Sequence, residues 1–191
     1  MVATTDKPKT LALEDFLALP ETKPASEYAD GAITQKPMPK GKHSRIQSRL
    51  AREIDQITES KKFALALTEL RCTMAGRSIV PDIAVVRWEN LPRDEDGEIG
   101  DRFDRHPDWV IEILSPEQSV TLVMEKIIFC LQQGTELGWL IDPQAKSVTT
   151  FQDGLPTIHL VEQEDTRAIA IMTGLEEWQL SVQDIFDWLK V

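Results

Sequence analysis

The amino-acid sequence predicts a single α/β domain with a mixed central sheet flanked by helices. Residues 109–114 form a short, nearly all-apolar run, which is typical of a strand buried on both faces. Helix-start residues follow this run directly, and residues 43–60 carry the spacing of an amphipathic helix. A chain of 191 residues with 41% hydrophobic residues can bury one sizeable core. We therefore expect residues 1–191 to be one domain, with a helix and connector at 1–26 and the core at 27–191.

The first part of the chain predicts a helix, a hairpin and a longer helix. Residues 10–19 are expected to form a short helix that ends at Pro20. Asp30-Gly31 then separates two short candidate strands, which indicates a β-hairpin. From residue 43 to residue 60, isoleucine and leucine recur every three or four positions, so one side of this helix is apolar and the other is polar.

The middle of the chain predicts strands separated by a charged loop. Residues 63–70 and 71–75 are candidate strands, and residues 79–88 are a β-branched run with Pro81-Asp82 near its start. A proline there suits the beginning of a strand or an edge strand, because proline cannot donate a hydrogen bond to the ladder. Residues 93–105 form a mixed-charge loop before the next buried strand.

Helix signals follow the buried strand at 109–114 and predict a β-to-α unit. Ser115 is a candidate N-cap, Pro116 suits the first helical position and Glu117 adds an early acid. The helix should run to Gln133 and stop at Gly134. The remaining segments predict strands at 137–143, 147–151, 157–161 and 167–172, a turn at Asp153-Gly154 and a terminal helix at 181–189.

Composition limits where the chain is expected to act. No segment approaches the roughly 18 consecutive apolar residues of a membrane helix, and residues 1–10 lack the apolar run of a secretory signal. We therefore expect a cytoplasmic protein that does not associate with a membrane. Cys72 and Cys130 are too few for a disulfide framework and too far apart for a metal-binding pair, so we expect two buried thiols in a reducing compartment.

Charge and motif content narrow the possible functions. The net charge of -11 argues against non-specific adhesion to DNA, because phosphate binding draws on clustered lysine and arginine. The sequence has no glycine-rich phosphate loop, no His-Glu-x-x-His motif and no Gly-x-Ser-x-Gly motif, so phosphate-loop nucleotide hydrolysis is not expected. One local stretch is nevertheless basic and leaves room for a basic patch: Lys36, Lys40, Lys42, His43, Arg45 and Arg49.

The single acid in the buried strand, Glu112, indicates a functional site. Glu112 would be costly there unless it were paired, hydrogen-bonded or bound to a metal, and strand alternation places it on the same face as Leu114. If Asp82 faces the same side from a neighbouring strand, the two carboxylates converge. Such hard oxygen ligands suit Mg²⁺, which polarises a phosphodiester and lowers the pKa of an attacking water.

A lysine beside the metal would stabilise the phosphorane-like anion, but the position two residues after the acid is Leu114. The nearest lysine is Lys126, on the flank of the apolar stripe of the following helix, from where its stem can reach inward. These residues also have structural interpretations. Asp82 can cap a turn, Glu112 can pair with an arginine such as Arg71, and Lys126 can be a solvated residue paired with a nearby acid.

An ordered series of motifs resembles a known family: Pro81-Asp82, Glu112-Ile113-Leu114-Ser115-Pro116, Glu125-Lys126, Gly134 and Gly138-Trp139-Leu140-Ile141-Asp142-Pro143. With Glu27, Asp30-Gly31 and His43, this series resembles Uma-two, a large cyanobacterial family of "putative restriction endonuclease" domains in the PD-(D/E)XK nuclease superfamily. The resemblance covers most of the chain. It implies a restriction-endonuclease-like fold, Mg²⁺ as the cofactor with Mn²⁺ as a substitute, DNA as the partner and a homodimer.

The resemblance also implies roles for individual residues. Asp82 and Glu112 would be metal ligands, and Lys126 would be the catalytic lysine, moved from the strand to the following helix. Glu27 would be a supporting catalytic acid. The implied reaction is hydrolysis of a DNA phosphodiester bond by an endonuclease, and two polar residues of the helix at 43–60 would contact the substrate at the cleft edge: His43 and Gln47.

The sequence departs from the family pattern at Gln118 and Leu122, where members commonly carry aspartate. With Leu114 and the acidic composition, these departures support an alternative function. The alternative is a non-catalytic module that keeps the nuclease fold for binding or assembly.

Overall fold

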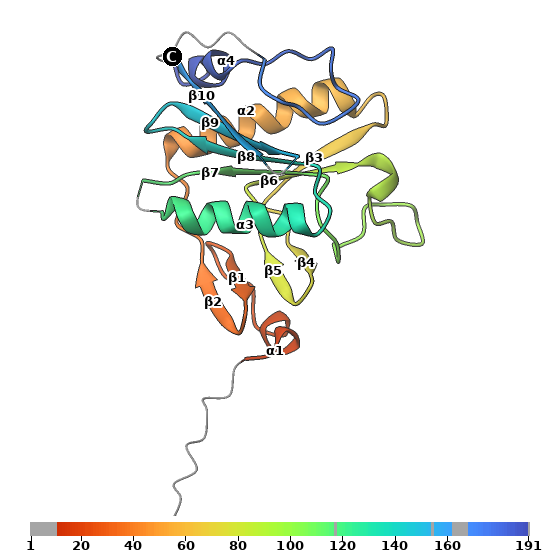
Figure 1. Cartoon of the computed structure of the whole chain (residues 1–191). Helices are drawn as coiled ribbons and strands as arrows, with labels where there is room; N and C mark the ends of the chain where they lie inside the picture. The colour runs from red at the N-terminus through yellow and green to blue at the C-terminus, as the bar shows by residue number, and fades with distance from the viewer. Residues whose placement is uncertain (1–10, 117, 154, 162–167, 191) are drawn as a thin grey trace, which may run out of the picture.

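Across residues 11–116, 118–153, 155–161 and 168–190, which the computed structural model describes, the chain forms two β-sheets and four α-helices (Figure 1). The predicted mixed α/β fold is confirmed. In chain order the elements are α1 (Leu13–Leu17), β1 (Ser26–Ala29), β2 (Ala32–Gln35), α2 (Gly41–Thr58), β3 (Ala64–Thr68), β4 (Cys72–Met74), β5 (Arg77–Ile79), β6 (Ile83–Arg87), a 3₁₀ turn (Trp88–Asn90), β7 (Trp109–Ile113), α3 (Val120–Gln132), β8 (Leu137–Asp142), β9 (Ser147–Gln152), β10 (Leu155–Leu160) and α4 (Val182–Asp187).

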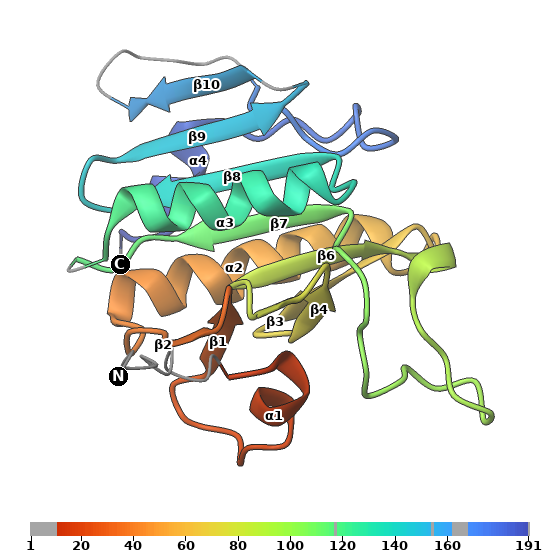
Figure 2. The ribbon, with the colours of Figure 1, turned by 60° about the horizontal axis from the view of Figure 1, so that its bottom comes forward.

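The larger sheet has six strands in the order β10-β9-β8-β7-β6-β3. Strands β7 and β8 are parallel, and the other neighbouring pairs of this sheet are antiparallel. Figure 2 shows the six strands side by side with α3 lying across β7 and β8. Because α3 connects these two strands, the predicted β-to-α unit supplies the crossover that a parallel pair requires.

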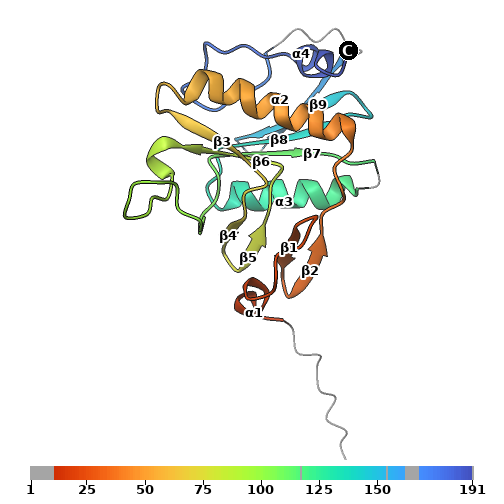
Figure 3. The same cartoon turned by 180° about the vertical axis from the view of Figure 1, so that it is seen from behind.

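Helices cover both faces of the six-stranded sheet. Helices α2 and α4 lie on one face, which Figure 3 shows from behind, and α3 lies on the opposite face (Figure 1). The smaller sheet, in the order β2-β1-β5-β4, lies on the α3 side. The ring of Phe16 in α1 stacks on Tyr28 in β1 at a centroid distance of 5.4 Å, so the first helix packs against this smaller sheet.

Side-chain alternation along β7 divides the apolar core into two clusters. Ile111 and Ile113 belong to the cluster that contains the buried residues of α2 and α4. Val110 and Leu114 belong to the cluster that contains the buried residues of α3. Glu112 alternates with Ile111 and Ile113 in the same way as Val110 and Leu114 do, so its side chain lies on the α3 face of the sheet, the face it shares with Leu114 as predicted.

Two buried aromatic residues and two buried thiols confirm the predicted interior. Trp109 and Trp139 are fully buried and meet edge to face at a centroid distance of 4.7 Å. Cys72 and Cys130 are free and buried, and burial raises the pKa of the Cys72 thiol to about 12. In the described part of the chain, no helix is both long and apolar enough to cross a membrane.

The run at 79–88 is not one strand but two. Strand β5 ends at Ile79 in the smaller sheet and β6 begins at Ile83 in the larger sheet, so Pro81-Asp82 lies on the crossing between them. Strand β6 lies between β7 and β3 and is not an edge strand. Proline is tolerated at this position because it precedes the ladder, in which its missing N–H would otherwise leave a gap.

Helix α3 begins at Val120, four residues later than the first helical position predicted at Pro116, and its N-cap is Ser119 rather than Ser115. Ser115 and Gln118 form a turn instead, in which the Ser115 N–H donates to Oε1 of Gln118 and the Gln118 N–H donates to the Ser115 carbonyl. Glu117 lies outside the described residues. The predicted stop is confirmed, since the helix ends before Gly134, whose φ of 111° suits glycine.

The strand predicted at 167–172 is wrong over its described part, residues 168–172, which has no regular structure. The backbone groups of this segment bond elsewhere: the Ile169 N–H donates to the Leu180 carbonyl, and the Trp139 indole N–H donates to the Ala170 carbonyl at 2.8 Å. Its apolar pattern reflects packing of Ile169 and Met172 against the core rather than pairing in a ladder.

Gly138 in β8 lets α3 approach the sheet closely. A Cβ atom on Gly138 would lie 2.3 Å from Cγ2 of Ile127, the buried neighbour of Lys126. We expect Gly138→Ala to lower the free energy of unfolding by about 1–3 kcal/mol, because the helix must shift or side chains must leave their rotamers. Urea unfolding measures this effect, with Gly41→Ala as the control, since nothing lies within 4 Å of an added Cβ there. Equal midpoints for the two variants would contradict the close contact.

Candidate active site

Asp82, one residue before strand β6, lies opposite Glu112 of the neighbouring strand β7. Strands β6 and β7 are antiparallel with Ile83 opposite Ile111, so the next position places Asp82 opposite Glu112. Both acids are almost completely buried, with 2% and 1% of their surfaces exposed. The N–H of Ile113 donates to Oδ2 of Asp82 at 2.7 Å, which ties the end of β7 to the start of β6. The structure therefore brings the two predicted ligand residues together.

Asp82 is held as a carboxylate by several donors. Its Oδ1 lies 2.7 Å from Nζ of Lys36, and its Oδ2 lies 3.1 Å from Nε2 of His43. Burial alone would raise the pKa of Asp82, but the hydrogen bond from His43 and the ammonium groups of Lys36 and Lys126 lower it more. The pKa of Asp82 therefore lies well below its usual range, and the group is charged at neutral pH.

Lys126 reaches from α3 to the carboxylates, as the sequence predicted. Its Nζ lies 2.9 Å from Oε1 of Glu112 and 2.9 Å from Oε1 of Glu27. Burial raises the pKa of Glu112 to about 8, against the lowering effect of the Lys126 ammonium. Burial also lowers the pKa of Lys126, but the carboxylates of Glu112, Glu27 and Asp82 raise it above its usual range. Glu112 thus pairs with Lys126, whereas Arg71 pairs with Glu21.

Glu27 bridges the smaller sheet and the lysine. Its Oε1 accepts a hydrogen bond from the Val80 N–H at 2.7 Å in addition to the Lys126 contact. Val80 immediately precedes Pro81-Asp82, so Glu27 holds both the segment that crosses between the two sheets and the ammonium of Lys126. The structure places this predicted supporting acid beside the other site residues.

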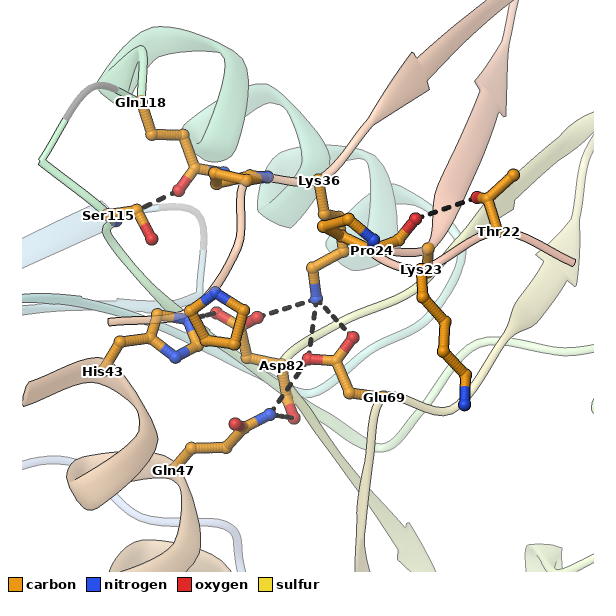
Figure 4. A pocket seen from close by; sticks show the side chains of 13 residues that line it. Thr22, Lys23, Pro24, Lys36, His43, Gln47, Glu69, Asp82, Ser115 and Gln118 are labelled. Carbon is orange, nitrogen blue, oxygen red and sulfur yellow. Dashed lines mark hydrogen bonds and ion pairs between the residues drawn. The ribbon is translucent and has the colours of Figure 1, made fainter. Parts of the chain in front are cut away.

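Lys36 and Glu69 belong to the same cluster, although the sequence did not single them out as site residues. Nζ of Lys36 lies 3.1 and 3.0 Å from the two carboxylate oxygens of Glu69, and it donates to the Val80 carbonyl at 2.8 Å. Figure 4 shows this ammonium pointing between Glu69 and Asp82. Local sequence could not reveal the contact, because Lys36 lies 33 residues from Glu69 and 46 residues from Asp82.

His43 and Gln47 point from α2 into the same cluster. His43 is buried against Asp82. The side-chain amide of Gln47 donates to the Asp82 carbonyl at 2.8 Å and to Oε1 of Glu69 at 3.0 Å. These contacts position Asp82 and Glu69, and the predicted role of both residues in substrate contact stays a prediction.

Three hollows lie around the candidate site, and the acids of the cluster that line them are Asp82, Glu69 and Glu27. One of about 340 Å³, drawn in Figure 4, is lined by Lys23, Lys36, His43 and Asp82 among others. A second of about 390 Å³ shares His43, Ser115 and Gln118 with the first and adds two basic residues, Lys40 and Lys42. A third of about 540 Å³ lies between the hairpin and α3 and reaches Glu27 and Lys126. Part of the predicted basic stretch therefore lines the approach to the site.

The two positions that depart from the family pattern differ in their surroundings. Gln118 lines all three hollows and holds the Ser115 turn through its side chain. Leu122 is exposed on α3 and lines the third hollow. An aspartate at either position would add negative charge near the site, so this chain has a less acidic rim than the family pattern implies.

Asp82 and Glu112 are the two acids of the cluster that would hold a divalent ion such as Mg²⁺. Asp82 and Glu112 offer carboxylate oxygens at facing positions, and proteins commonly bind Mg²⁺ through one or two carboxylates with several waters retained. Within residues 11–116, 118–153, 155–161 and 168–190, no group of three or more histidine, cysteine, aspartate or glutamate side chains forms a metal-binding cluster. Water and substrate oxygens would therefore complete the coordination.

Comparisons with known proteins find a family of "putative restriction endonuclease" proteins and a similar solved structure. A family model described as "Uma2: Putative restriction endonuclease" matches residues 13–183. A crystal structure of "a putative nuclease belonging to DUF820 from Anabaena variabilis ATCC 29413" is similar, with a TM-score of 0.90 and 45% sequence identity, and the match covers 94% of this chain and 99% of that chain. No curated protein matches the chain.

Proposed function

The chain belongs to the Uma2 family of "putative restriction endonuclease" proteins, and we propose that it is a metal-dependent endonuclease that hydrolyses phosphodiester bonds of DNA. The observation that carries this proposal is the facing pair of buried acids, Asp82 and Glu112, with the ammonium of Lys126 on the second. Two neighbouring carboxylates in the interior are costly unless cations compensate them. A divalent ion and a lysine are the cations that phosphodiester hydrolysis uses.

Each residue of the cluster has a distinct task in this proposal. Asp82 and Glu112 would hold Mg²⁺ or Mn²⁺, which when bound polarises the phosphate and lowers the pKa of an attacking water. Lys126 is fixed by two acids, so its ammonium is in place to stabilise the negative charge that builds up on the phosphate oxygens. Glu27 positions Lys126, and His43 positions Asp82.

Basic residues around the hollows support DNA as the substrate. Lys23, Lys40 and Lys42 line the hollows beside the acids, and lysines near a groove contribute to phosphate binding in a salt-dependent way. This local charge counters the overall net charge of -11. We further propose a homodimer, since cleavage of both strands of a duplex is simplest with two sites.

Plasmid cleavage tests the proposed reaction. The parent should nick or linearise plasmid DNA with Mg²⁺ or Mn²⁺, and EDTA should stop it. Glu112→Ala should lower the rate about 10³-fold, because a bound ion contributes several kcal/mol and each 1.36 kcal/mol is tenfold in rate. Glu125→Ala, which removes an exposed acid of α3, should leave the rate unchanged. Equal residual cleavage by the parent and Glu112→Ala would remove the proposal.

A non-catalytic binding or assembly module is the second candidate. The observation that favours it is that Lys36 and Lys126 already compensate the acids within the chain. A thermal-shift series with Mg²⁺ and Mn²⁺ separates the two functions, because an ion that binds only the folded state raises the melting temperature. A melting temperature that no divalent ion changes would favour the module.

A further inference from the structure

The ammonium of Lys36 occupies a position that is surrounded by oxygen atoms. Four oxygens lie within 2.7 to 3.1 Å of its Nζ: both carboxylate oxygens of Glu69, Oδ1 of Asp82 and the carbonyl oxygen of Val80. Carboxylate and carbonyl oxygens are also the ligands that hard divalent cations prefer. Lys36 therefore fills a place with the chemistry of a cation site.

The chain holds Lys36 firmly in this place. Its side chain is only 8% exposed, and its backbone N–H donates to the Ala25 carbonyl at 3.0 Å. Gln47 fixes Glu69 from α2. Because Pro37 follows immediately, the backbone of this segment has a restricted φ as well. The ammonium is thus held from the hairpin side, the helix side and the crossing segment.

Charge counting limits how many divalent ions the cluster can accept. With His43 neutral and Glu112 ionised by a bound cation, Glu27, Glu69, Asp82 and Glu112 carry four negative charges, of which the ammonium groups of Lys36 and Lys126 compensate two. One divalent ion neutralises the remainder. A second ion would leave the cluster with two excess positive charges, which the buried acids Asp82 and Glu112 and the low-dielectric interior around them disfavour.

We propose that Lys36 takes the place of a second divalent ion next to Asp82, so that each chain binds a single divalent ion, at Asp82 and Glu112. This inference rests on the proposed metal-dependent function. Lys36 acts as a positioning residue. It keeps Asp82 in place and prevents a second metal ion from binding between Asp82 and Glu69. Removing its charge should open that side to a second ion.

Counting Mn²⁺ bound to the full chain tests the inference, by calorimetry and by the electron paramagnetic resonance signal of free Mn²⁺. The parent should bind one ion. Lys36→Met and Lys36→Gln, which remove the charge, should each bind two. Lys23→Met is the matched control and should bind one, because Lys23 lines the same hollow but its ammonium does not lie between Asp82 and Glu69 in Figure 4. Circular dichroism verifies that each variant is folded.

The outcomes separate this inference from the proposed reaction. Two ions bound by the parent would overturn the inference even if neither Lys36 variant folds. A count of one in the parent and in both folded Lys36 variants would overturn it as well, and would leave the cleavage reaction standing. A change from one ion to two without any DNA cleavage would support the inference and overturn the reaction. No ion bound by the parent would overturn both.

Discussion

Replacing Asp82 with asparagine is expected to lower the rate of DNA cleavage by about 10²–10³-fold, a loss typical of removing one essential electrostatic group, and to weaken Mn²⁺ binding. The amide oxygen of asparagine can still accept the Ile113 N–H, so the end of β7 stays attached to β6. The negative charge is lost, however, and with it the attraction for a cation and for the Lys36 ammonium. Initial rates on plasmid DNA and Mn²⁺ calorimetry measure the two effects.

Asp108 offers a matched control for Asp82. It is also a buried aspartate, and its Oδ2 accepts a backbone N–H, from Arg87 at 2.8 Å. It precedes the first residue of β7, so it lies at the opposite end of the strand from Ile113. Asp108→Asn should lower the melting temperature but leave the cleavage rate unchanged at temperatures where the variant is folded. If Asp82→Asn cleaved as fast as Asp108→Asn, the assigned role of Asp82 would be wrong.

Trp139→Ala is expected to lower the free energy of unfolding by about 3–5 kcal/mol, the usual loss when a buried tryptophan is truncated. Trp139 is fully buried in β8, where it meets Trp109 edge to face. Its indole N–H also satisfies the Ala170 carbonyl, so truncation leaves both a cavity and an unpaired acceptor. Guanidinium unfolding followed by far-UV circular dichroism measures the change.

Leu155→Ala is the control for the tryptophan variant. Leu155 lies on the edge strand β10 and is 76% exposed, so its truncation should change the free energy of unfolding by about 0.5 kcal/mol or less. Both variants remove apolar atoms from the six-stranded sheet, so the difference between them reflects the burial of Trp139 together with its larger size and its hydrogen bond to Ala170. A loss of less than about 1 kcal/mol for Trp139→Ala would contradict the tight packing between the two tryptophans.

The parts of the site that sequence predicted share a local cause. Glu112 stands out because it is an acid in a run that is otherwise apolar, and strand alternation then fixes its face. Lys126 follows from helix periodicity, which places it beside the buried residue Ile127. Both patterns depend on only a few neighbouring residues, so they can be recognised in the sequence without knowledge of the fold.

The residues that sequence did not identify as site residues depend on contacts between distant segments. In the sequence, Lys36 is one lysine of a basic stretch, and Glu69 falls within the candidate strand at 63–70. The hairpin has to pack against the crossing at Pro81-Asp82 before these two side chains meet. A charge-balance argument could have pointed to them, since several buried acids require more cations than Lys126 alone.

The boundaries that differed from prediction have a similar explanation. The helix signals at Ser115 were real turn signals, but the side chain of Gln118 satisfied the Ser115 N–H and delayed the helix to Val120. In residues 168–172 an apolar pattern was satisfied by packing on the core without a ladder. In both cases the local pattern was compatible with two backbone paths: a local side-chain contact selected the turn at Ser115, and packing on the core selected the path of residues 168–172.

The arrangement around the crossing at Pro81-Asp82 makes the candidate active site easier to disrupt than the folded core. Asp82 and Glu112 belong to the six-stranded framework, whereas Lys36 and Glu27 arrive from the hairpin. A molecule whose hairpin swung open would retain its main core and lose the two groups that hold the acids in order. Under the proposed reaction, a variant with a loosened hairpin is therefore expected to lose cleavage activity before it loses stability.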